Sequence, residues 1–341
     1  MDTSDAGHGG ARIPVLGQPG STAAGRLRRA LQLALGIAWL ADAALQFQPY
    51  MFGRAFVLNI LLPTAAGNPR PVAAPQTWVA HLILHDVAAW NALFATIQLA
   101  VGLGMLWSRT LRAALAVSIM WALGVWWFGE GLGGVLSGGA SPVSGAPGAV
   151  ILYALLAVLV WPTAARGGVS VAAASPLGAP WSAVLWLLLW GGMATLALQP
   201  VNRAPGGLRD TVLTQDAGEP RWVDSINHAA AAAAGHRGAV IATVLGVLLA
   251  VAGLGVLAPR PLRRVTVILA ICLAIAIWVI GEDFGGILTG HGTDPNSGPL
   301  LALLALAFWP LRRHPRYTGP DRRQAGNERA TWEKRRKVAA S

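Results

Sequence analysis

The feature that most constrains this chain is a series of long apolar runs that carry almost no charge. A helix of about 20 apolar residues is long enough to cross the hydrocarbon core of a bilayer. Only 12% of the 341 residues are charged, about half the share found in soluble domains. The sequence therefore predicts an all-α integral membrane protein with eight transmembrane helices. These span residues 27–47, 88–107, 112–130, 148–162, 180–199, 238–257, 264–282 and 298–311.

The basic residues are distributed as topology signals and not as a nucleic-acid-binding surface. The formal net charge is +11, yet ten Lys and Arg residues lie within 312–337 and most of the others flank apolar runs. A cytoplasmic N-terminus places 20 of the 26 Lys and Arg residues on the cytoplasmic side, as the positive-inside rule requires. Nearly all are arginine, which indicates a GC-rich bacterial genome. We expect a multi-pass protein of the bacterial inner membrane with both termini cytoplasmic, surrounded by the lipid bilayer and binding no nucleic acid.

Short sequence elements recur in the same order at offsets of 148 to 152 residues, which indicates an internal duplication. Residues 128–138 match 280–290, and the dipeptides at 48–49 and 161–162 recur at 199–200 and 309–310. Each copy holds four predicted spans, so the copies are parallel and related by a pseudo-twofold axis along the membrane normal. The predicted order is a cytoplasmic tail (1–25), a first four-helix repeat (26–163), a cytoplasmic linker (164–179), a second four-helix repeat (180–311) and a basic cytoplasmic tail (312–341).

Three acidic residues are candidates for catalysis or proton transfer. Glu130 and Glu282 occupy equivalent positions in the recurring Gly-Glu-x-x-Gly-Gly-x-x-x-Gly element, at the outer end of the third span of each copy. Asp42 lies inside the first span. Ionisable residues at membrane depth are rare and are taken as functional by default. A structural role stays open for the glutamates, because a carboxylate here can also cap loop amides or pair with an arginine at the outer rim.

Most of the histidines lie on the external side of the predicted topology. His85 and His236 are equivalent across the duplication, and each precedes the second span of its copy. Together with the two glutamates they predict a site near the pseudo-axis, of a composition that suits zinc, iron or manganese. The same set suits a proton relay, a histidine pair can ligate a haem, and each histidine alone can form interfacial hydrogen bonds. The sequence names no cofactor.

Aromatic and acidic residues near the glutamates predict the walls of a ligand pocket. Trp126, Trp127 and Trp278 precede the two Gly-Glu elements, and Asp283 and Asp294 follow the second glutamate. We expect these five residues to bind a substrate, with the tryptophans forming a stacking surface for a quinone ring. The alternative is an interfacial aromatic belt, which membrane proteins form from Trp at span ends.

The run from Leu35 to Pro49 resembles the first helix of the DoxX/DoxD-like membrane proteins, in which small and aromatic residues precede a polar patch. That family is built from four-helix units, which agrees with the span count of each copy. The resemblance implies respiratory-chain or thiol and sulfur redox chemistry, with a quinone as electron acceptor. It covers the first helix of one copy and the span count. The Gly-Glu element is not part of it, and it carries over no catalytic residue.

Three functions fit these features. The first is a redox-linked membrane subunit that handles a quinone or small thiols near the outer face, together with a membrane redox partner. The second is a transporter or channel for a small solute or ion, although the cytoplasmic halves of the spans contain almost no polar residues. The third is a non-catalytic membrane scaffold. The sequence contains no nucleophile triad, phosphate loop or nucleotide fingerprint, which disfavours a self-sufficient hydrolase or an ATP-driven pump.

Overall fold

The computed structural model describes residues 23–163, 169–214, 218–311 and 336, and the regular structure in these ranges is entirely helical. The chain up to Leu311 forms one compact unit, which contains both predicted repeats. The predicted terminal tails lie almost entirely outside the described residues, as does part of the predicted linker. The longer helices are α1 (Ala23–Gln46), α3 (Arg70–Leu84), α4 (Val87–Leu106), α5 (Leu111–Phe128), α6 (Ala149–Leu159), α7 (Gly178–Ala197), α10 (Arg221–Ala234), α11 (Gly238–Leu254), α12 (Arg260–Ile280) and α13 (Ser297–Ala307). The shorter helices are α2 (Arg54–Phe56), α8 (Pro200–Arg203) and α9 (Gly207–Thr214).

Five helices in the described part of the chain are long and apolar enough to cross a membrane: α4, α5, α7, α11 with its short extension to Leu257, and α12. The chain is therefore a multi-pass membrane protein, and the count of eight spans stays a prediction. The helix α1 is long enough, but its arginines and the polar residues Gln32, Asp42 and Gln46 reduce its hydropathy. The helices α6 and α13 have 11 residues each, about 16 Å of helix, or roughly half of the hydrocarbon thickness.

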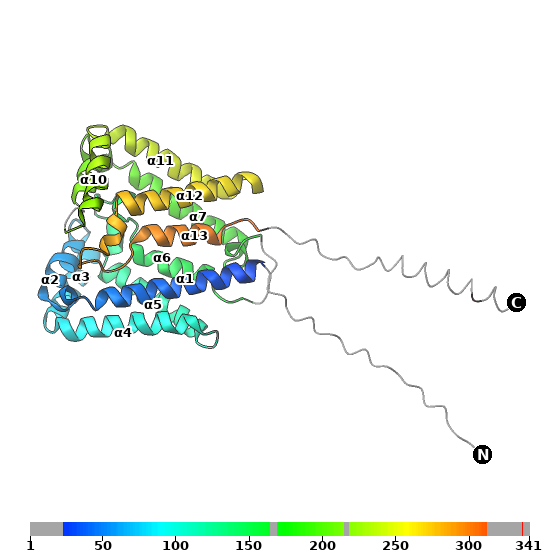
Figure 1. The fold of residues 1–341 in the computed structure, drawn as a ribbon, viewed down its shortest axis with the longest axis horizontal. Coiled ribbons are helices and arrows are strands. Elements are labelled where there is room, and N and C mark those ends of the chain that lie inside the picture. The colour runs from blue at the N-terminus through cyan, green and yellow to red at the C-terminus, as the bar shows by residue number, and fades with distance from the viewer. Residues whose placement is uncertain (1–22, 164–168, 215–217, 312–335, 337–341) are drawn as a thin grey trace, which may run out of the picture. The chain divides into compact units, whose positions relative to one another are not determined.

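The long helices lie side by side, and the two short apolar helices occupy the centre of the unit (Figure 1). The helix α1 packs on α4, α7 on α11, α5 on α6 and α12 on α13, and α6 and α13 also pack on each other. Small residues allow the closest crossing: a Cβ at Gly102 of α4 would meet the Leu40 side chain and the Gly36 carbonyl of α1. We call residues 23–163 the N-terminal half and residues 169–311 the C-terminal half.

Each half receives the glycine-rich connection that precedes the last helix of the other half. In the connection from α5 to α6, the short 3-10 helix η5 (Pro142–Ser144) packs against α7, α9 and α12. In the connection from α12 to α13, the Gly292 carbonyl accepts a hydrogen bond from the Gln48 side chain at 3.5 Å, and the His291 ring lies 4.2 Å from the Tyr50 ring. Residues distant in sequence are therefore neighbours at the junction of the two halves.

The two glycine-rich connections begin with the same unusual backbone. Leu132 and Phe284, which are equivalent across the duplication, have φ angles of 56° and 57°. A residue other than glycine seldom adopts this left-handed backbone conformation, which costs about 1–3 kcal/mol. The recurring Gly-Glu element therefore marks one specific backbone geometry in both halves.

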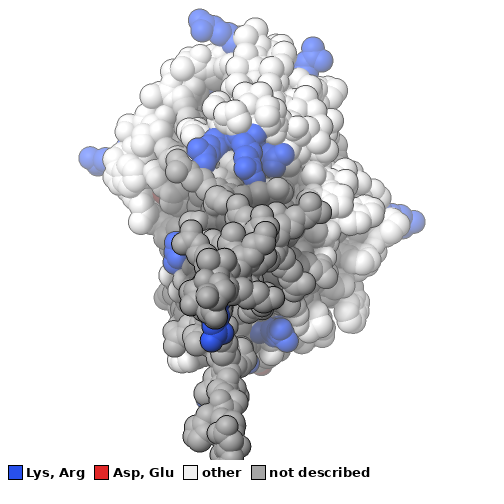
Figure 2. All heavy atoms as spheres, turned by 90° about the vertical axis from the view of Figure 1, so that its right-hand side faces the viewer, with Lys and Arg blue, Asp and Glu red and all other residues white. Residues whose placement is uncertain are grey.

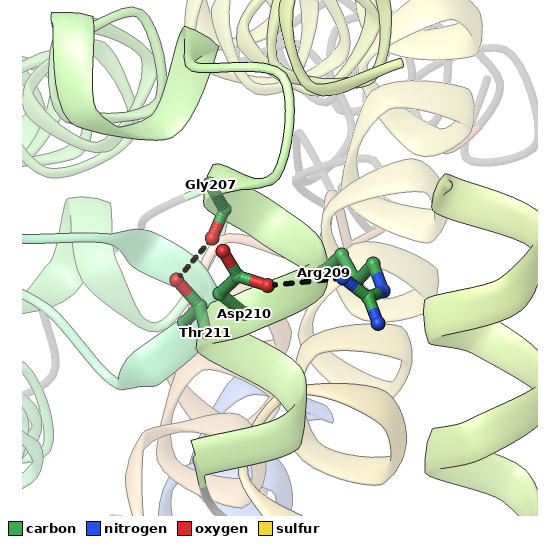
Figure 3. A network of polar contacts seen from close by, with 4 residues as sticks. All are labelled: Gly207, Arg209, Asp210 and Thr211. Carbon is green, nitrogen blue, oxygen red and sulfur yellow. Dashed lines mark hydrogen bonds and ion pairs between the residues drawn. The ribbon is translucent and has the colours of Figure 1, made fainter. Parts of the chain in front are cut away.

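Short helices cover one end of the unit. The helices α2, α3 and α10 lie across the ends of the long helices (Figure 1). The helix α9 belongs to the same loop as α10 and carries a local network, in which Arg209 pairs with Asp210 at 3.5 Å and the Thr211 hydroxyl donates to the Gly207 carbonyl at 2.8 Å (Figure 3). Both charged side chains are exposed, so this pair contributes little to stability.

Arginines gather at the opposite end of the unit, where α1 begins (Figure 2). Arg29 donates from its guanidinium to the carbonyl oxygens of Met105 and Leu106 at 3.0 and 2.5 Å. Arg28 donates to the Ala174 carbonyl at 3.0 Å. These contacts satisfy carbonyls that a helix end leaves without partners. The arginines of α1 therefore fasten the end of α4 and the segment before α7.

Candidate functional site

A cavity of about 340 Å³ lies between α1, α4, α5 and the short helices at the end of the unit opposite the arginines, and residues of the N-terminal half form most of its wall. Most of its wall is apolar and aromatic, as in small-molecule sites generally. The aromatic wall residues are Trp39, Phe56, Phe94, Trp121 and Phe128. The polar wall residues are Asp42, Gln46, Thr64, Gln98, Glu130, Thr293 and Asp294. Below, we call this space the lateral cavity.

Asp42 reaches the lateral cavity from near the C-terminal end of α1. Trp39, Asp42 and Gln46 follow one another at spacings of three and four residues, which places them on one face of the helix. The buried Asp42 accepts a hydrogen bond at 2.8 Å from the hydroxyl of Tyr153, which α6 supplies. One turn deeper, the Trp39 indole donates to the Ser118 hydroxyl at 2.9 Å. The Trp39–Ser118 contact closes the cavity toward the arginine-bearing end.

Glu130 lines the lateral cavity just beyond the end of α5. Its carboxylate accepts hydrogen bonds from the backbone N–H of Val150 at 3.1 and 3.3 Å. Val150 lies in the first turn of α6, where backbone N–H groups have no partner within the helix. A carboxylate at that position also interacts favourably with the helix dipole. Glu130 therefore stabilises the start of α6 and, at the same time, presents a carboxyl group to the cavity.

Asp294 comes to the same cavity from the C-terminal half. Its two carboxyl oxygens accept hydrogen bonds from the Asn296 backbone N–H at 2.7 Å and the Thr293 hydroxyl at 2.8 Å. Burial raises the pKa of the Asp294 carboxyl above its ordinary value. The predicted site residues Asp42, Glu130 and Asp294 thus line one space.

Three polar atoms of residues in the cavity wall are buried without a hydrogen-bond partner in the described part of the chain. They are Oε1 of Gln46, Oε1 of Gln98 and Nε1 of Trp121. Gln46 is 6% exposed and Gln98 is 7% exposed. Buried polar atoms are nearly always bonded in folded proteins, so each exception needs an explanation. All three atoms are themselves fully buried, so a ligand in the cavity would reach them only after a change of side-chain rotamer.

The lateral cavity reaches the outer surface of α5, the face turned away from the protein core. Met120 and Phe128 line the cavity and are 65% and 39% exposed. Gly124 lies between them on the same face, and a Cβ added at Gly124 would meet no atom within 4 Å. In a helix long and apolar enough to cross a membrane, this face contacts lipid. The cavity is therefore accessible from the side, through the bilayer.

Glu282 and Asp283, also predicted as site residues, do not line the lateral cavity. Glu282 is buried beyond the end of α12 and accepts hydrogen bonds from the Ser297 hydroxyl and, at 2.9 Å, from the Gly298 backbone N–H. Burial raises the pKa of Glu282 to about 7. Asp283 accepts a hydrogen bond from the Asn227 side chain at 2.6 Å. The observed contacts of Glu282 are those of a carboxylate that caps the start of α13; its catalytic role stays a prediction.

The predicted tryptophans lie beside the cavity and not in its wall. The Trp126 indole donates to the Pro147 carbonyl at 2.7 Å, and the Trp278 indole donates to the Pro295 carbonyl at 2.8 Å. These equivalent contacts tie each glycine-rich connection to the helix before it. Trp127 is exposed and stacks on Phe128, with ring centroids 5.6 Å apart. Substrate binding by these three residues stays a prediction.

The sequence also contained a signal for residues that were not predicted. Asn91 and Gln98 interrupt the apolar run of α4 at a spacing of seven residues, which places both on one helix face. In the structure this face meets α1, where the Asn91 side chain donates to the Gln46 carbonyl at 2.7 Å. The cavity-facing Trp39 and Trp121 had no comparable signal, because many tryptophans occur in these helices.

The histidines proposed as metal ligands are exposed side chains. His85 ends α3, and His236 precedes α11. Within the described ranges there is no group of three or more His, Cys, Asp or Glu side chains that could hold a metal ion. The metal site on His85 and His236 therefore stays a prediction that no cluster of described residues supports.

Comparison with protein-family models, curated proteins and solved structures finds no match. The resemblance of the first helix to DoxX-like proteins accordingly stays a prediction. The function must be argued from the lateral cavity and the residues around it.

Proposed function

We propose that this protein is a redox-linked membrane subunit that binds a quinone or quinol in the lateral cavity. The observation that carries the proposal is a largely apolar and aromatic cavity that opens on the exposed face of α5, with three carboxyl groups in its wall. A quinone is a flat ring with two polar oxygens and an apolar tail, and it diffuses within the membrane. Such a molecule matches a pocket with aromatic walls and a few polar groups that fix orientation.

The arrangement of the wall suggests how the ligand would lie. The ring would enter past Met120 and Gly124 and lie beside Trp121, with its tail left toward the lipid. One ring oxygen would then lie on the side of the cavity that Gln98 and Trp121 line. The other would face the Asp42 side, where Trp39 closes the cavity.

Carboxyl groups supply the proton chemistry that a quinone requires. Reduction of a quinone to a quinol consumes two electrons and two protons, and oxidation of the quinol releases them. Asp42, Glu130 and Asp294 line the cavity and would exchange the protons. The electrons would pass to or from a membrane redox partner.

The topology belongs to the same proposal. Eight spans in two parallel four-helix repeats, in a bacterial inner membrane with both termini cytoplasmic, would place the arginine-bearing end inside and the short covering helices outside. Equivalent contacts support the duplication: Glu130 caps α6 as Glu282 caps α13, and Trp126 holds Pro147 as Trp278 holds Pro295.

A transporter of small cationic solutes is the second candidate. It is favoured by three carboxyl groups lining one cavity whose described wall includes no Lys, Arg or His. Against it, the core beyond the Trp39–Ser118 contact is mostly apolar, with Leu31 and Leu35 buried there, and the buried Gln32 donates to the Val160 carbonyl at 2.8 Å. A pathway through the protein would need polar groups on that side, so a one-sided binding site fits better.

The test is a binding titration of the purified protein in lipid nanodiscs with a short-tailed benzoquinone. Quenching of tryptophan fluorescence reports binding, because Trp39 and Trp121 line the cavity. A Gly124→Leu variant adds bulk at the opening, and its Cβ would meet no atom within 4 Å. Gly191→Leu is the matched control: it is also an open helix position, but on α7, away from the cavity. We expect Gly124→Leu to abolish saturable quenching and Gly191→Leu to retain it. Absence of binding in the unmodified protein, or equal binding in both variants, would contradict the proposal.

A further inference from the structure

We infer that the lateral cavity also binds amphiphilic organic cations, molecules with an ammonium group on an apolar or aromatic body, and that each bound cation displaces one proton from the wall. This inference goes beyond the proposed function, because it assigns a second class of ligand to the cavity and does not require that a quinone binds there. It also requires no pathway through the protein, since the ligand enters from the bilayer and returns to it.

The charge of the wall is the first argument. Asp42, Glu130 and Asp294 come from three separate segments and line one space of about 340 Å³, and the described wall contains no Lys, Arg or His. Carboxyl groups that share a buried space without a cation hold their protons, because burial and neighbouring acids both disfavour the charged form. An entering cation supplies the missing positive charge. One carboxyl group then releases its proton to the solvent and, as a carboxylate, pairs with the ligand.

Few other titratable groups surround Asp42. The helices α4, α6 and α13 pack on α1, and Tyr153 of α6 is the only titratable side chain that these three described helices contain. Its hydroxyl donates to Asp42, which stabilises the carboxylate once the proton has left. Arg29, the nearest arginine on α1, precedes Asp42 by 13 residues, about 20 Å of helix. The ligand is therefore the cation that would lie closest to this carboxyl group.

The charged side chains around Glu130 and Asp294 do not replace the ligand either. They belong to α2, to α3 and to the connections before and after the end of α12. Those with a basic group are exposed and do not line the cavity: Arg54, Arg70, His81 and His291. Glu282 is a further acid, bonded to the start of α13.

The aromatic wall is the second argument, since the face of an aromatic ring attracts a cation. Phe94 of α4 and Trp121 of α5 have ring centroids 5.5 Å apart and planes inclined at 56°, so they present two differently oriented rings. Phe56 and Phe128 also line the cavity. Aromatic cages recognise quaternary ammonium groups, and here carboxyl groups lie in the same wall.

The wall suits an organic cation better than a metal ion. Among the described residues, no group of three or more His, Cys, Asp or Glu side chains could hold a metal ion. The three carboxyl groups therefore do not converge on one point, as ligands of a metal ion must. An organic cation is larger, and its apolar part would lie toward Met120 and Gly124, where the cavity meets the exposed face of α5.

The probe is benzyltrimethylammonium, whose charge does not change with pH, titrated by calorimetry into the protein in nanodiscs of zwitterionic lipid. We expect saturable binding whose affinity rises by up to about tenfold per pH unit between about pH 6 and pH 8, as the release of one proton requires. Titration in two buffers that differ in their enthalpy of ionisation should count about one proton released per bound cation. The neutral isostere neopentylbenzene should show no such rise. No saturable binding of the cation, or the same affinity across this range, would overturn the inference.

A short-tailed benzoquinone, titrated into the same nanodiscs, keeps the two conclusions apart. If the quinone binds and the cation does not, the inference is wrong and the proposed function stands. If the cation binds and the quinone does not, the proposed function is wrong and the inference stands.

Two kinds of variant place the cation in the cavity. A triple variant with Asp42→Asn, Glu130→Gln and Asp294→Asn removes every carboxyl group from the described wall, and each amide keeps an oxygen that can accept the existing hydrogen bond. Asp86→Asn is its control, because Asp86 is an exposed acid that caps α4 outside the cavity, a role that asparagine also performs. Gly124→Leu blocks the opening without altering any charge. The triple variant and Gly124→Leu should lose saturable binding, whereas Asp86→Asn should keep it. Binding that persists in Gly124→Leu, or that is lost in Asp86→Asn, would overturn the assignment to the cavity.

Discussion

In the N-terminal half, α1 presents Asp42 and Gln46 toward the lateral cavity, whereas the C-terminal half has Met193 and Ala197 at the positions 151 residues later. Apolar residues also replace polar ones on the neighbouring helix, where Asn91 and Gln98 of α4 correspond to Ala242 and Leu249 of α11. The four apolar counterparts are buried. Trp39 and Trp190 occupy equivalent places in both halves.

The difference separates what the fold requires from what a ligand requires. In both halves a glutamate caps the start of the last helix, and a tryptophan indole donates a hydrogen bond to the connection that precedes this helix. The C-terminal half shows that this scaffold forms with an apolar core at the equivalent positions. The polar residues of α1 and α4 are thus not needed to build the four-helix arrangement, and they are costly to bury. Their presence in one half alone is what the proposed binding site would explain.

The largest effect should follow from giving the C-terminal half the acid of the N-terminal half. Met193→Asp places a carboxyl group in an apolar core, where the buried Leu301 occupies the position equivalent to Tyr153. We expect a loss of about 3–5 kcal/mol in the free energy of unfolding, as for other buried charges without a partner. Denaturation of the protein in detergent micelles measures it. The reverse change, Asp42→Met with Tyr153→Phe, should cost far less. If Met193→Asp were well tolerated, the cores of the two halves would not differ in their capacity to bury a carboxyl group.

The next effect is a pH dependence that belongs to the C-terminal half. Burial raises the pKa of Glu282 from its ordinary value of 4.5 to about 7. A raised pKa means that the folded protein binds the proton more tightly than the unfolded chain does. The resulting stability is fully present below pH 4.5 and is lost as the pH rises through about 7. The melting temperature should fall across this range, and Glu282→Gln should reduce the slope. An unchanged slope in the variant would refute the assignment to Glu282.

Trp126→Phe acts on the N-terminal half and Trp278→Phe on the C-terminal half, and the two variants should lose similar amounts of stability. Each removes one indole hydrogen bond to a proline carbonyl and should cost about 1 kcal/mol. Thermal denaturation of the two single variants, side by side, checks the prediction. A large effect in one half and none in the other would show that the shared contacts are not equivalent.

The smallest effect concerns an ion pair that lies outside the lateral cavity and outside both glycine-rich connections. Arg209→Ala removes the exposed ion pair with Asp210 on α9 (Figure 3). The free energy of unfolding should change by no more than about 0.5 kcal/mol, because exposed pairs are screened by water and salt. The quinone affinity should not change. A marked loss of affinity would indicate that the loop carrying α9 takes part in binding.

The sequence predicted the helices well where composition alone decides the outcome. The apolar runs of α4, α5, α7, α11 and α12 became helices of spanning length because lipid leaves the backbone no other partner than itself. The predicted fourth span of each copy begins where predicted but is an 11-residue helix, because it ends before the Trp-Pro dipeptide at 161–162 or 309–310.

The site was predicted only in part, for a physical reason. Glu130 and Glu282 look alike in sequence and have alike contacts, yet only Glu130 lines the cavity. Whether space stays open beside them depends on side chains of distant helices, such as Gln98. Asp294 reaches the cavity because a connection from one half inserts into the other. No local pattern encodes such long-range contacts.

The most direct test of the account is the quinone content of protein purified from native membranes, measured by solvent extraction and mass spectrometry. The comparison is with a variant in which Asp42→Met and Gln98→Leu give the N-terminal cavity the residues of the C-terminal half. The account predicts about one quinone or quinol per chain in the unmodified protein, as expected for a single cavity, and almost none in the variant. No bound quinone in the unmodified protein, or the same amount in both, would contradict it.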